Sequence, residues 1–242
     1  MPALLRTSDH PAADRGELWR FVMGQFFLPH EMTFDGSAGF NGLLRARAIG
    51  PMKVADATAG AHHVARTTRL CATSETDYYK VGMPLRGYCL VTQDGREAPL
   101  LPGDISVYDT SRPYTLTFND TCQMALVMFP RRFLRLSPDE MHGVTASRIS
   151  GRHGTGTLAS PLLRNLVLHI DEFSEHQSMQ IADNVFDLLA TVFCERLGKS
   201  ATPVVGTTQT LLLRIKVFIE NHLDDAELTP DAVAAAVHIS TG

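Results

Sequence analysis

The sequence lacks long hydrophobic runs, closely spaced metal-ligand pairs and an excess of positive charge. No stretch approaches the roughly 20 consecutive apolar residues of a membrane-spanning helix, and residues 1–20 have no apolar segment of the kind found in secretion signals. The 242 residues carry a net charge of −4, which disfavours a surface built mainly to bind nucleic acid. We therefore predict a soluble, cytoplasmic protein with no membrane partner.

The common signatures of metal sites and hydrolytic or nucleotide-binding enzymes are also missing. There is no His-x-His, and His62 and His63 are adjacent, so on a strand they would point to opposite sides. No Gly-x-Ser-x-Gly elbow or phosphate-binding loop occurs, and residues 151–156 (GRHGTG) lack dinucleotide-loop spacing. The four cysteines form no Cys-x-x-Cys pair, which favours buried, reduced thiols. We expect no metal, no cofactor and no enzymatic activity.

The first half of the chain changes from a helical to a strand period. Apolar residues recur at helical spacing over residues 13–28 and stop at Pro29. From residue 43 to residue 129, short alternating segments lie between turn residues; one strand is predicted over Leu85–Thr92 and another over Pro113–Phe118. Asp94-Gly95 is a strong hairpin signal, because both residues adopt positive φ readily. Strands at this spacing predict an antiparallel barrel or jelly roll.

After Pro130 the period returns to that of helices. Apolar stripes predict one helix around Leu162–Phe173 and another around Ile181–Val192. The segment Ser174–Ser178 between them is predicted as a connector of a length suited to an antiparallel pair. Their width also makes a dimer interface plausible. A Gly-, Ser-, Thr- and Pro-rich stretch follows as a linker, and then a helix over Leu211–Leu223. Thr229 is a natural N-cap for a last helix, with Pro230 in its first position.

Tyrosines and arginines concentrate in the strand-rich region, where they are able to line a pocket. Aromatic rings supply apolar area, and an arginine holds a carboxylate through two hydrogen bonds. The alternative is that the arginines are solvated and the tyrosines cover strand edges. The candidate ligand-binding residues are His63, Arg69, Tyr79, Arg86, Tyr88, Tyr108 and Tyr114.

Two separated stretches resemble the AraC family of transcription regulators. Residues 86–96 (RGYCLVTQDGR), with Leu-Pro-Gly-Asp at 101–104 and DTSRPY at 109–114, resemble the effector-binding domain of the AraC-binding-like branch. Residues 213–223 and 228–240 resemble the opening of that family's helix-turn-helix domain. The resemblance implies a cupin-like sensor barrel, a helical dimerisation segment and a DNA-binding domain, with Thr229 and Ser240 on the phosphate side of the DNA contact.

The sequence departs from the family pattern at its C-terminal end. The recognition helix, the connecting helix and the second helix-turn-helix unit would follow Thr241, and Gly242 is the last residue. We interpret the chain as a regulator truncated within its first helix-turn-helix unit, whether as a fragment, as a deliberately shortened version or as a degenerate product. The expected divisions are residues 1–42 (N-terminal helix and lead-in), 43–135 (effector-binding barrel), 136–198 (dimerisation helices), 199–210 (linker) and 211–242 (start of the helix-turn-helix domain).

The predicted class is thus α+β, a cupin-like antiparallel barrel or jelly roll followed by helices. The expected function is the sensing and dimerising part of an AraC-like regulator that controls transcription in response to a small molecule. Its expected partners are a small-molecule effector, a second copy of the chain and, for the full-length protein, promoter DNA. The alternatives are a stand-alone cupin-like binding protein without DNA binding, and a cupin enzyme, which the missing metal ligands disfavour.

Overall fold

The computed structural model describes residues 3–34, 39–73, 77–199 and 228–237, and the short stretches 215–216, 218–219 and 222. The strands are β1 (Ala3–Arg6), β2 (Glu31–Phe34), β3 (Gly42–Ile49), β4 (Met52–Ala59), β5 (His62–Arg66), β6 (Tyr78–Arg86), β7 (Cys89–Gln93), β8 (Arg96–Leu100), β9 (Ser106–Asp109), β10 (Tyr114–Phe118) and β11 (Cys122–Pro130). The helices are η1 (Thr7–Asp9), α1 (Arg15–Phe26), α2 (Thr68–Cys71), η2 (Arg131–Phe133), α3 (Pro138–His142), α4 (Gly156–Leu168), α5 (Glu175–Arg196) and α7 (Pro230–Ala236).

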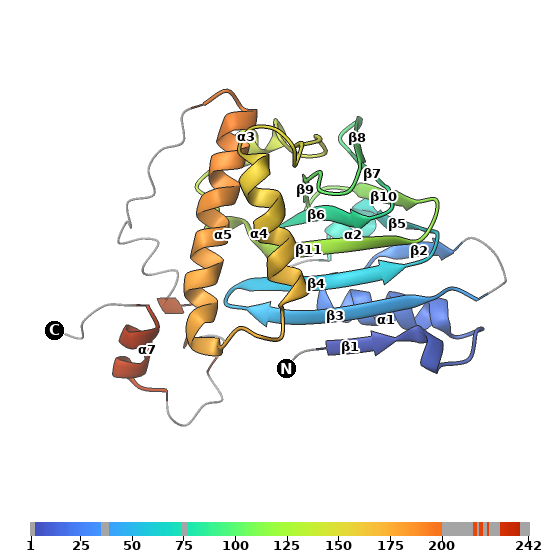
Figure 1. Cartoon of the computed structure of the whole chain (residues 1–242), viewed down its shortest axis with the longest axis horizontal. Coiled ribbons are helices and arrows are strands. Elements are labelled where there is room, and N and C mark those ends of the chain that lie inside the picture. The colour runs from blue at the N-terminus through green and yellow to red at the C-terminus, as the bar shows by residue number, and fades with distance from the viewer. Residues whose placement is uncertain are drawn as a thin grey trace.

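Within the described residues, the strands form two antiparallel sheets that pack as a sandwich. The six-stranded sheet has the order β1-β3-β4-β11-β6-β9, and the five-stranded sheet has the order β2-β5-β10-β7-β8. Figure 1 shows α4 and α5 side by side across the outer face of the six-stranded sheet. The predicted α+β class, with antiparallel sheets followed by helices, is confirmed.

The two faces of the six-stranded sheet bury two separate apolar clusters. We call the cluster between the sheets the sandwich core; it includes Trp19, Leu44, Tyr108 and Leu116. We call the cluster between the six-stranded sheet and α4 and α5 the helix-covered core; it includes Phe129. Successive side chains of a strand point to opposite faces, so β3, β4, β6, β9 and β11 contribute to both cores.

The hairpin predicted at Asp94-Gly95 is confirmed, but the strand predicted over Leu85–Thr92 is wrong. Asp94 and Gly95 have φ of 53° and 73°, and Gln93 pairs with Arg96 across the turn. The chain instead breaks at Gly87, where φ is +81° and a Cβ would lie 2.6 Å from the Thr121 carbonyl oxygen. At this break the chain leaves the six-stranded sheet and enters the five-stranded one, so one apolar segment supplies strands to both sheets.

The N-terminal segment contributes to the sandwich as well as to a helix. The helix predicted over residues 13–28 is confirmed as α1, which ends before Pro29. Strand β1 pairs with β3, and β2 pairs with β5, so residues before position 43 extend both sheets. Helix α1 buries Trp19 and Met23 against the sandwich core.

The helices after the sandwich agree with the predicted pattern, with different boundaries. Helix α4 ends at Leu168, so Ile170 and Phe173 lie beyond it. The segment Ser174–Ser178 is not a connector, because Ser174 forms a capping box with Gln177 and starts α5. Both helices direct their apolar stripes mainly into the helix-covered core.

At the C-terminal end, Thr229 caps α7 as predicted, its Oγ1 accepting a hydrogen bond from the Ala232 N–H at 3.2 Å. Pro230 occupies the first helical position. The predicted linker from residue 200 onward and most of the helix predicted over 211–223 lie outside the described residues. None of the helices in the described part of the chain is long and apolar enough to cross a membrane. The four cysteines are free thiols, of which Cys89, Cys122 and Cys194 are buried.

Candidate functional site

The sandwich core contains a small internal cavity with polar side chains in its wall. Its volume open to water-sized molecules is about 30 Å³. The lining residues come from α1, from both sheets and from the segment before β2: Trp19, Met23, His30, Met32, Ala57, Ala59, His62, Val64, Lys80, Leu116, Phe118, Cys122, Met124 and Leu126. A cavity of this size admits a water molecule but no organic ligand until side chains move.

Lys80 is the only cationic side chain in the cavity wall, and it is 2% exposed. It pairs with Tyr108 across β6 and β9, and its Nζ lies 3.9 Å from the centroid of the Phe27 ring. Within the part of the chain that the structure describes, Lys80 makes no hydrogen bond or ion pair. Burial, and secondarily the charge of Arg66, lowers the pKa of Lys80 to about 7.

His30 is also buried in the wall and stays neutral near pH 7. Burial, assisted by the charges of Lys80 and Arg66, lowers the pKa of His30 well below its ordinary value; an interaction with the Leu28 carbonyl opposes this shift. Nε2 of His30 is hydrogen-bonded to Tyr114 Oη at 2.6 Å. Burial raises the pKa of the Tyr114 phenol above its ordinary value, so this pair is uncharged as well.

Several buried polar atoms in the sandwich lack partners. Trp19 Nε1, Ser106 Oγ and Tyr108 Oη make no hydrogen bond with any described residue. A Cβ built at Gly82 would lie 3.2 Å from Met124 Cε and 3.7 Å from Tyr108 Oη, which places the Tyr108 hydroxyl beside a cavity-lining side chain. Buried polar groups are normally hydrogen-bonded, so unpaired ones beside a cavity point to a missing partner.

Asp109, on the strand next to Lys80, is directed away from it, because Asp109 pairs with Tyr79 and Lys80 pairs with Tyr108. Its carboxylate oxygens accept hydrogen bonds from Ser111, Arg112 and Arg131. Burial by itself would raise the pKa of Asp109. The hydrogen bonds from Arg131 and Ser111, together with the Arg131 charge, outweigh this effect, so the pKa of Asp109 is lowered. Asp109 is therefore a satisfied carboxylate outside the cavity wall, and Lys80 keeps no counter-charge.

Of the seven ligand-binding residues expected from the sequence, the structure brings together Tyr108 and Tyr114. Their ring centroids are 4.6 Å apart, and Tyr114 is bonded to the cavity-lining His30. Tyr79 points the other way, into the helix-covered core. Arg86 and Tyr88 are exposed near the break at Gly87.

The remaining two expected residues lie on β5 and α2. His63 faces away from the cavity and hydrogen-bonds Thr117 Oγ1 at 3.1 Å, whereas its neighbour His62 lines the cavity. This opposition is the one expected for adjacent residues of a strand. Arg69 is exposed and pairs with Glu31 at 3.1 Å. Of the two residues expected at DNA, Thr229 serves as the α7 N-cap, and Ser240 lies outside the described residues.

Sequence reasoning missed Lys80 and His30. The available signal for Lys80 was a lysine inside an otherwise apolar strand, in a chain with only four lysines. No comparable signal existed for His30, which follows a helix in an irregular segment and reaches Tyr114 across 84 positions.

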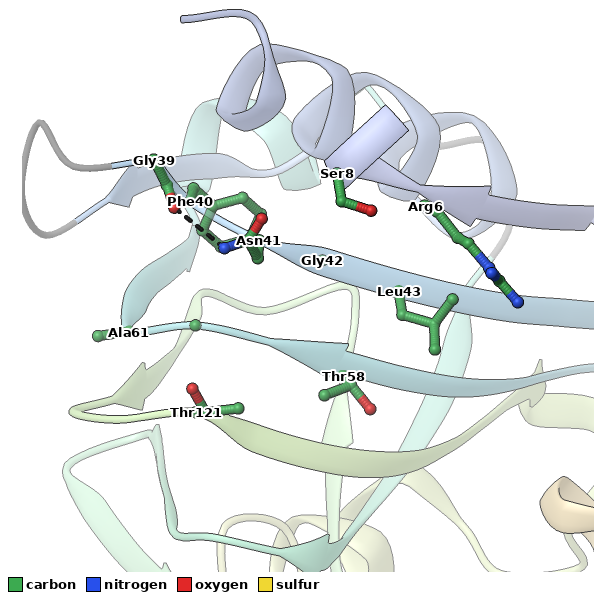
Figure 2. Close-up of a pocket in the computed structure, with 11 residues that line it drawn as sticks. Arg6, Ser8, Gly39, Phe40, Asn41, Gly42, Leu43, Thr58, Ala61 and Thr121 are labelled. Carbon is green, nitrogen blue, oxygen red and sulfur yellow. Dashed lines mark hydrogen bonds between the residues drawn. The ribbon is translucent and has the colours of Figure 1, made fainter. Parts of the chain in front are cut away.

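A larger recess of about 540 Å³ lies on the surface at the ends of β3 and β4 (Figure 2). It is lined by Arg6, Ser8, Gly39, Phe40, Asn41, Gly42, Leu43, Thr58, Gly60, Ala61 and Thr121. This recess is open, and its lining contains no buried polar atom without a partner. Phe40 connects the two spaces, since its ring centroid lies 5.7 Å from Trp19 and 5.6 Å from His62. We therefore take the internal cavity as the candidate site.

The described residues contain no group of three His, Cys, Asp or Glu side chains arranged to hold a metal ion. The chemistry of the cavity is thus that of a buried cation, neutral hydrogen-bonding groups and methionines. No carboxylate among the described residues lines the cavity, and the Cys122 thiol donates to the Arg86 carbonyl oxygen. This arrangement is suited to binding.

Comparisons with known proteins agree with a regulator-type binding domain. The model of the AraC-binding-like domain matches residues 19–194. The chain is 29% identical over 240 residues to the "Uncharacterized protein in nit 5'region" of Bacillus sp. (strain OxB-1), covering 98% of this chain and 92% of that protein. It is 25% identical over 245 residues to the transcriptional activator NphR of Rhodococcus sp, covering 99% of this chain and 73% of NphR.

A solved structure shows a similar fold. The crystal structure of the AraC-like transcriptional activator CuxR superposes with a TM-score of 0.71, at 18% sequence identity, covering 99% of this chain and 85% of that one. The matched family region, residues 19–194, includes the cavity-lining strands, α4, and α5 except for its last two residues.

Proposed function

Because the chain belongs to the AraC-binding-like domain family, we propose that it is the effector-sensing and dimerising portion of an AraC-type transcription regulator. The observation that carries the proposal is the family match over residues 19–194, which spans the sandwich with its polar-lined cavity. A small molecule binds in the sandwich core and shifts the regulator between two arrangements. Such coupling requires that the molecule bind the two arrangements unequally.

The proposed division of labour follows the chain order. Residues 43–135, with the strands before them, bind the effector, and residues 136–198 form the dimer interface. Residues 199–210 connect this part to residues 211–242, which begin the helix-turn-helix domain. Helix α7, capped by Thr229, is the first helix of that unit, and the resemblance to the family assigns Ser240 to the phosphate side of the DNA contact. The protein works in the cytoplasm, where promoter DNA is accessible.

Dimerisation is assigned to α4 and α5, whose outer surface keeps apolar side chains at the solvent. Leu158 of α4 is 64% exposed, and Ile181 and Leu188 of α5 are only partly buried. Exposed apolar area of this kind on paired helices favours association with a second copy.

The test uses the purified product of the complete gene. We expect light scattering to give a dimer, and selection from fragmented genomic DNA to enrich a small set of promoter fragments. Leu158→Asp should weaken the dimer, whereas Leu4→Asp, at an equally exposed position (64%) on β1, should leave it intact. A monomer at high concentration would contradict the dimer. A protein that enriches no DNA fragment would instead support the stand-alone binding protein.

A further inference from the structure

We propose that the effector is a small organic anion whose carboxylate pairs with Lys80 inside the sandwich core while its apolar part lies among the cavity-lining methionines. The inference rests on the proposed sensor function and names the chemical class of its ligand. It is carried by the buried, unpaired Lys80 and by the donors around the cavity.

The first step is the missing counter-charge of Lys80. A buried charge is normally paired, because desolvation without a partner costs several kcal/mol. Among the described residues, the partner of Lys80 Nζ is the face of the Phe27 ring, 3.9 Å from its centroid, and no acidic side chain lines the cavity. A ring face stabilises a cation but leaves the three N–H donors of the ammonium unused. An anion entering the cavity would supply the missing acceptors.

The second step concerns the neutral groups near Lys80. Trp19 Nε1 is a donor only, and the Tyr108 hydroxyl is free to donate; neither has a partner among the described residues. Together with Lys80 they favour an acceptor-rich group such as a carboxylate, and they disfavour a cationic ligand.

The charged and titratable groups around Lys80 carry no negative charge near pH 7. Arg66 is a cation, and its Nη1 donates to the Pro29 carbonyl at 2.7 Å. Burial raises the pKa of Tyr108, Tyr114 and Cys122, so all three stay protonated. Arg66 and His30 interact electrostatically with Lys80, and Tyr108 lies opposite it on β9. His62 and Cys122 share the cavity wall, and Tyr114 is hydrogen-bonded to His30. The local potential is therefore positive or neutral, which favours an anion.

The third step is the apolar part of the ligand. Met23, Met32 and Met124 line the cavity, together with Leu116 and Phe118. Methionine side chains rearrange easily, so the cavity of about 30 Å³ is able to open around a small apolar group. Trp19 and Met23 belong to α1, so a ligand in the cavity would contact that helix directly.

The experiment uses the single tryptophan, Trp19, as the reporter. The full chain is titrated with matched acid and amide pairs, hexanoate against hexanamide and benzoate against benzamide, and the fluorescence of Trp19 is followed. We expect the acids to bind about tenfold or more tightly than their amides. In Lys80→Met the acids should lose that advantage and bind like the amides.

Lys53→Met is the matched control. Lys53 Nζ lies 6.0 Å from the Phe26 ring centroid, much as Lys80 lies over Phe27, but Lys53 is only partly buried and does not line the cavity. Its loss should leave the acid affinities within about twofold of wild type. Circular dichroism and melting curves establish that both variants fold.

The pH dependence gives a second readout. Pairing with a carboxylate favours protonated Lys80, so binding should take up a proton above pH 7, and acid affinity should fall as the pH rises. If the wild-type protein binds amides as tightly as acids, the proposal that the effector is an anion is wrong, whereas the proposed sensor function is unaffected. Failure of every acid to bind would also overturn it. The sensor function itself is judged by the DNA selection and the dimer measurement.

Discussion

The two cores of this protein share one sheet but differ in chemistry. Along β6, Tyr79 and Val81 enter the helix-covered core, and Lys80 between them enters the sandwich core. The helix-covered core consists of apolar side chains such as Phe129, Phe186 and Leu163. The sandwich core includes a buried lysine, a buried histidine and unpaired donors beside a cavity. The difference agrees with the proposal that one face of the sheet mainly stabilises the fold and the other face binds the effector.

The energetic meaning of this difference follows from burial. Apolar groups in close contact stabilise the fold, whereas a buried polar group without a partner destabilises it by about 1–3 kcal/mol. The unpartnered polar groups therefore lower the stability of the free protein, and the proposed ligand would stabilise it by supplying their partners.

The largest effect should come from truncation in the helix-covered core. Phe129 packs on Phe186, with ring centroids 5.0 Å apart, and is fully buried. We expect Phe129→Ala to lower the free energy of unfolding by about 3–5 kcal/mol, measured by urea denaturation, and to leave acid binding at Trp19 unchanged. Phe118→Ala, the same truncation in the cavity wall, is the control that should change binding. Equal effects of both substitutions on binding would remove the distinction between the cores.

An intermediate effect of opposite sign is expected for Lys80→Met. Lys80 has a lower pKa in the folded protein (about 7) than in the unfolded chain, where its ordinary value is 10.5, so folding expels a proton between these pH values. The penalty is complete below pH 7 and disappears as the pH rises toward 10. Removing the charge should therefore stabilise the protein by about 1–4 kcal/mol at pH 6–7, with a smaller gain at higher pH. Urea unfolding measured across this pH range gives the sign of the change in unfolding free energy. A lower stability of Lys80→Met at pH 6 would contradict the conclusion that Lys80 has no counter-charge.

The smallest effect should distinguish the two tyrosines of the sandwich core. Tyr114 Oη is hydrogen-bonded to His30, whereas Tyr108 Oη has no partner among the described residues. We expect Tyr114→Phe to lower the free energy of unfolding by about 1–2 kcal/mol and Tyr108→Phe to be neutral or slightly stabilising. Thermal unfolding of the two variants side by side measures the difference. Equal losses would show that the Tyr108 hydroxyl has a partner in the free protein.

Much of the fold could be predicted from local patterns. Alternation over Tyr114–Phe118 places Tyr114, Leu116 and Phe118 on one buried face, and the Asp94-Gly95 turn sets the β7–β8 register. These features depend on neighbours within a few positions. The break at Gly87 was missed because the apolar pattern continues across it, and only the approach of the Thr121 carbonyl requires a glycine there.

The candidate site was predicted less well, for a physical reason. Tyrosines and arginines were selected for their chemistry, but the face of the sheet decides which of them reach the cavity. Tyr79 and Tyr108 are similar in sequence terms, yet they lie on opposite faces of the same sheet. Without the strand register, inward and outward positions are not distinguishable.

The sequence by itself determined the class of the molecule: strands and then helices, reduced cysteines, a capped helix at Thr229 and membership of the AraC family on its motifs. These properties follow from the amino-acid composition and from sequence patterns that span only a few residues. Only the tertiary structure decided that Lys80 lies buried without a counter-charge and that Tyr108 and Tyr114 meet. Burial and partner choice depend on contacts between segments far apart in the chain, and no local pattern encodes them.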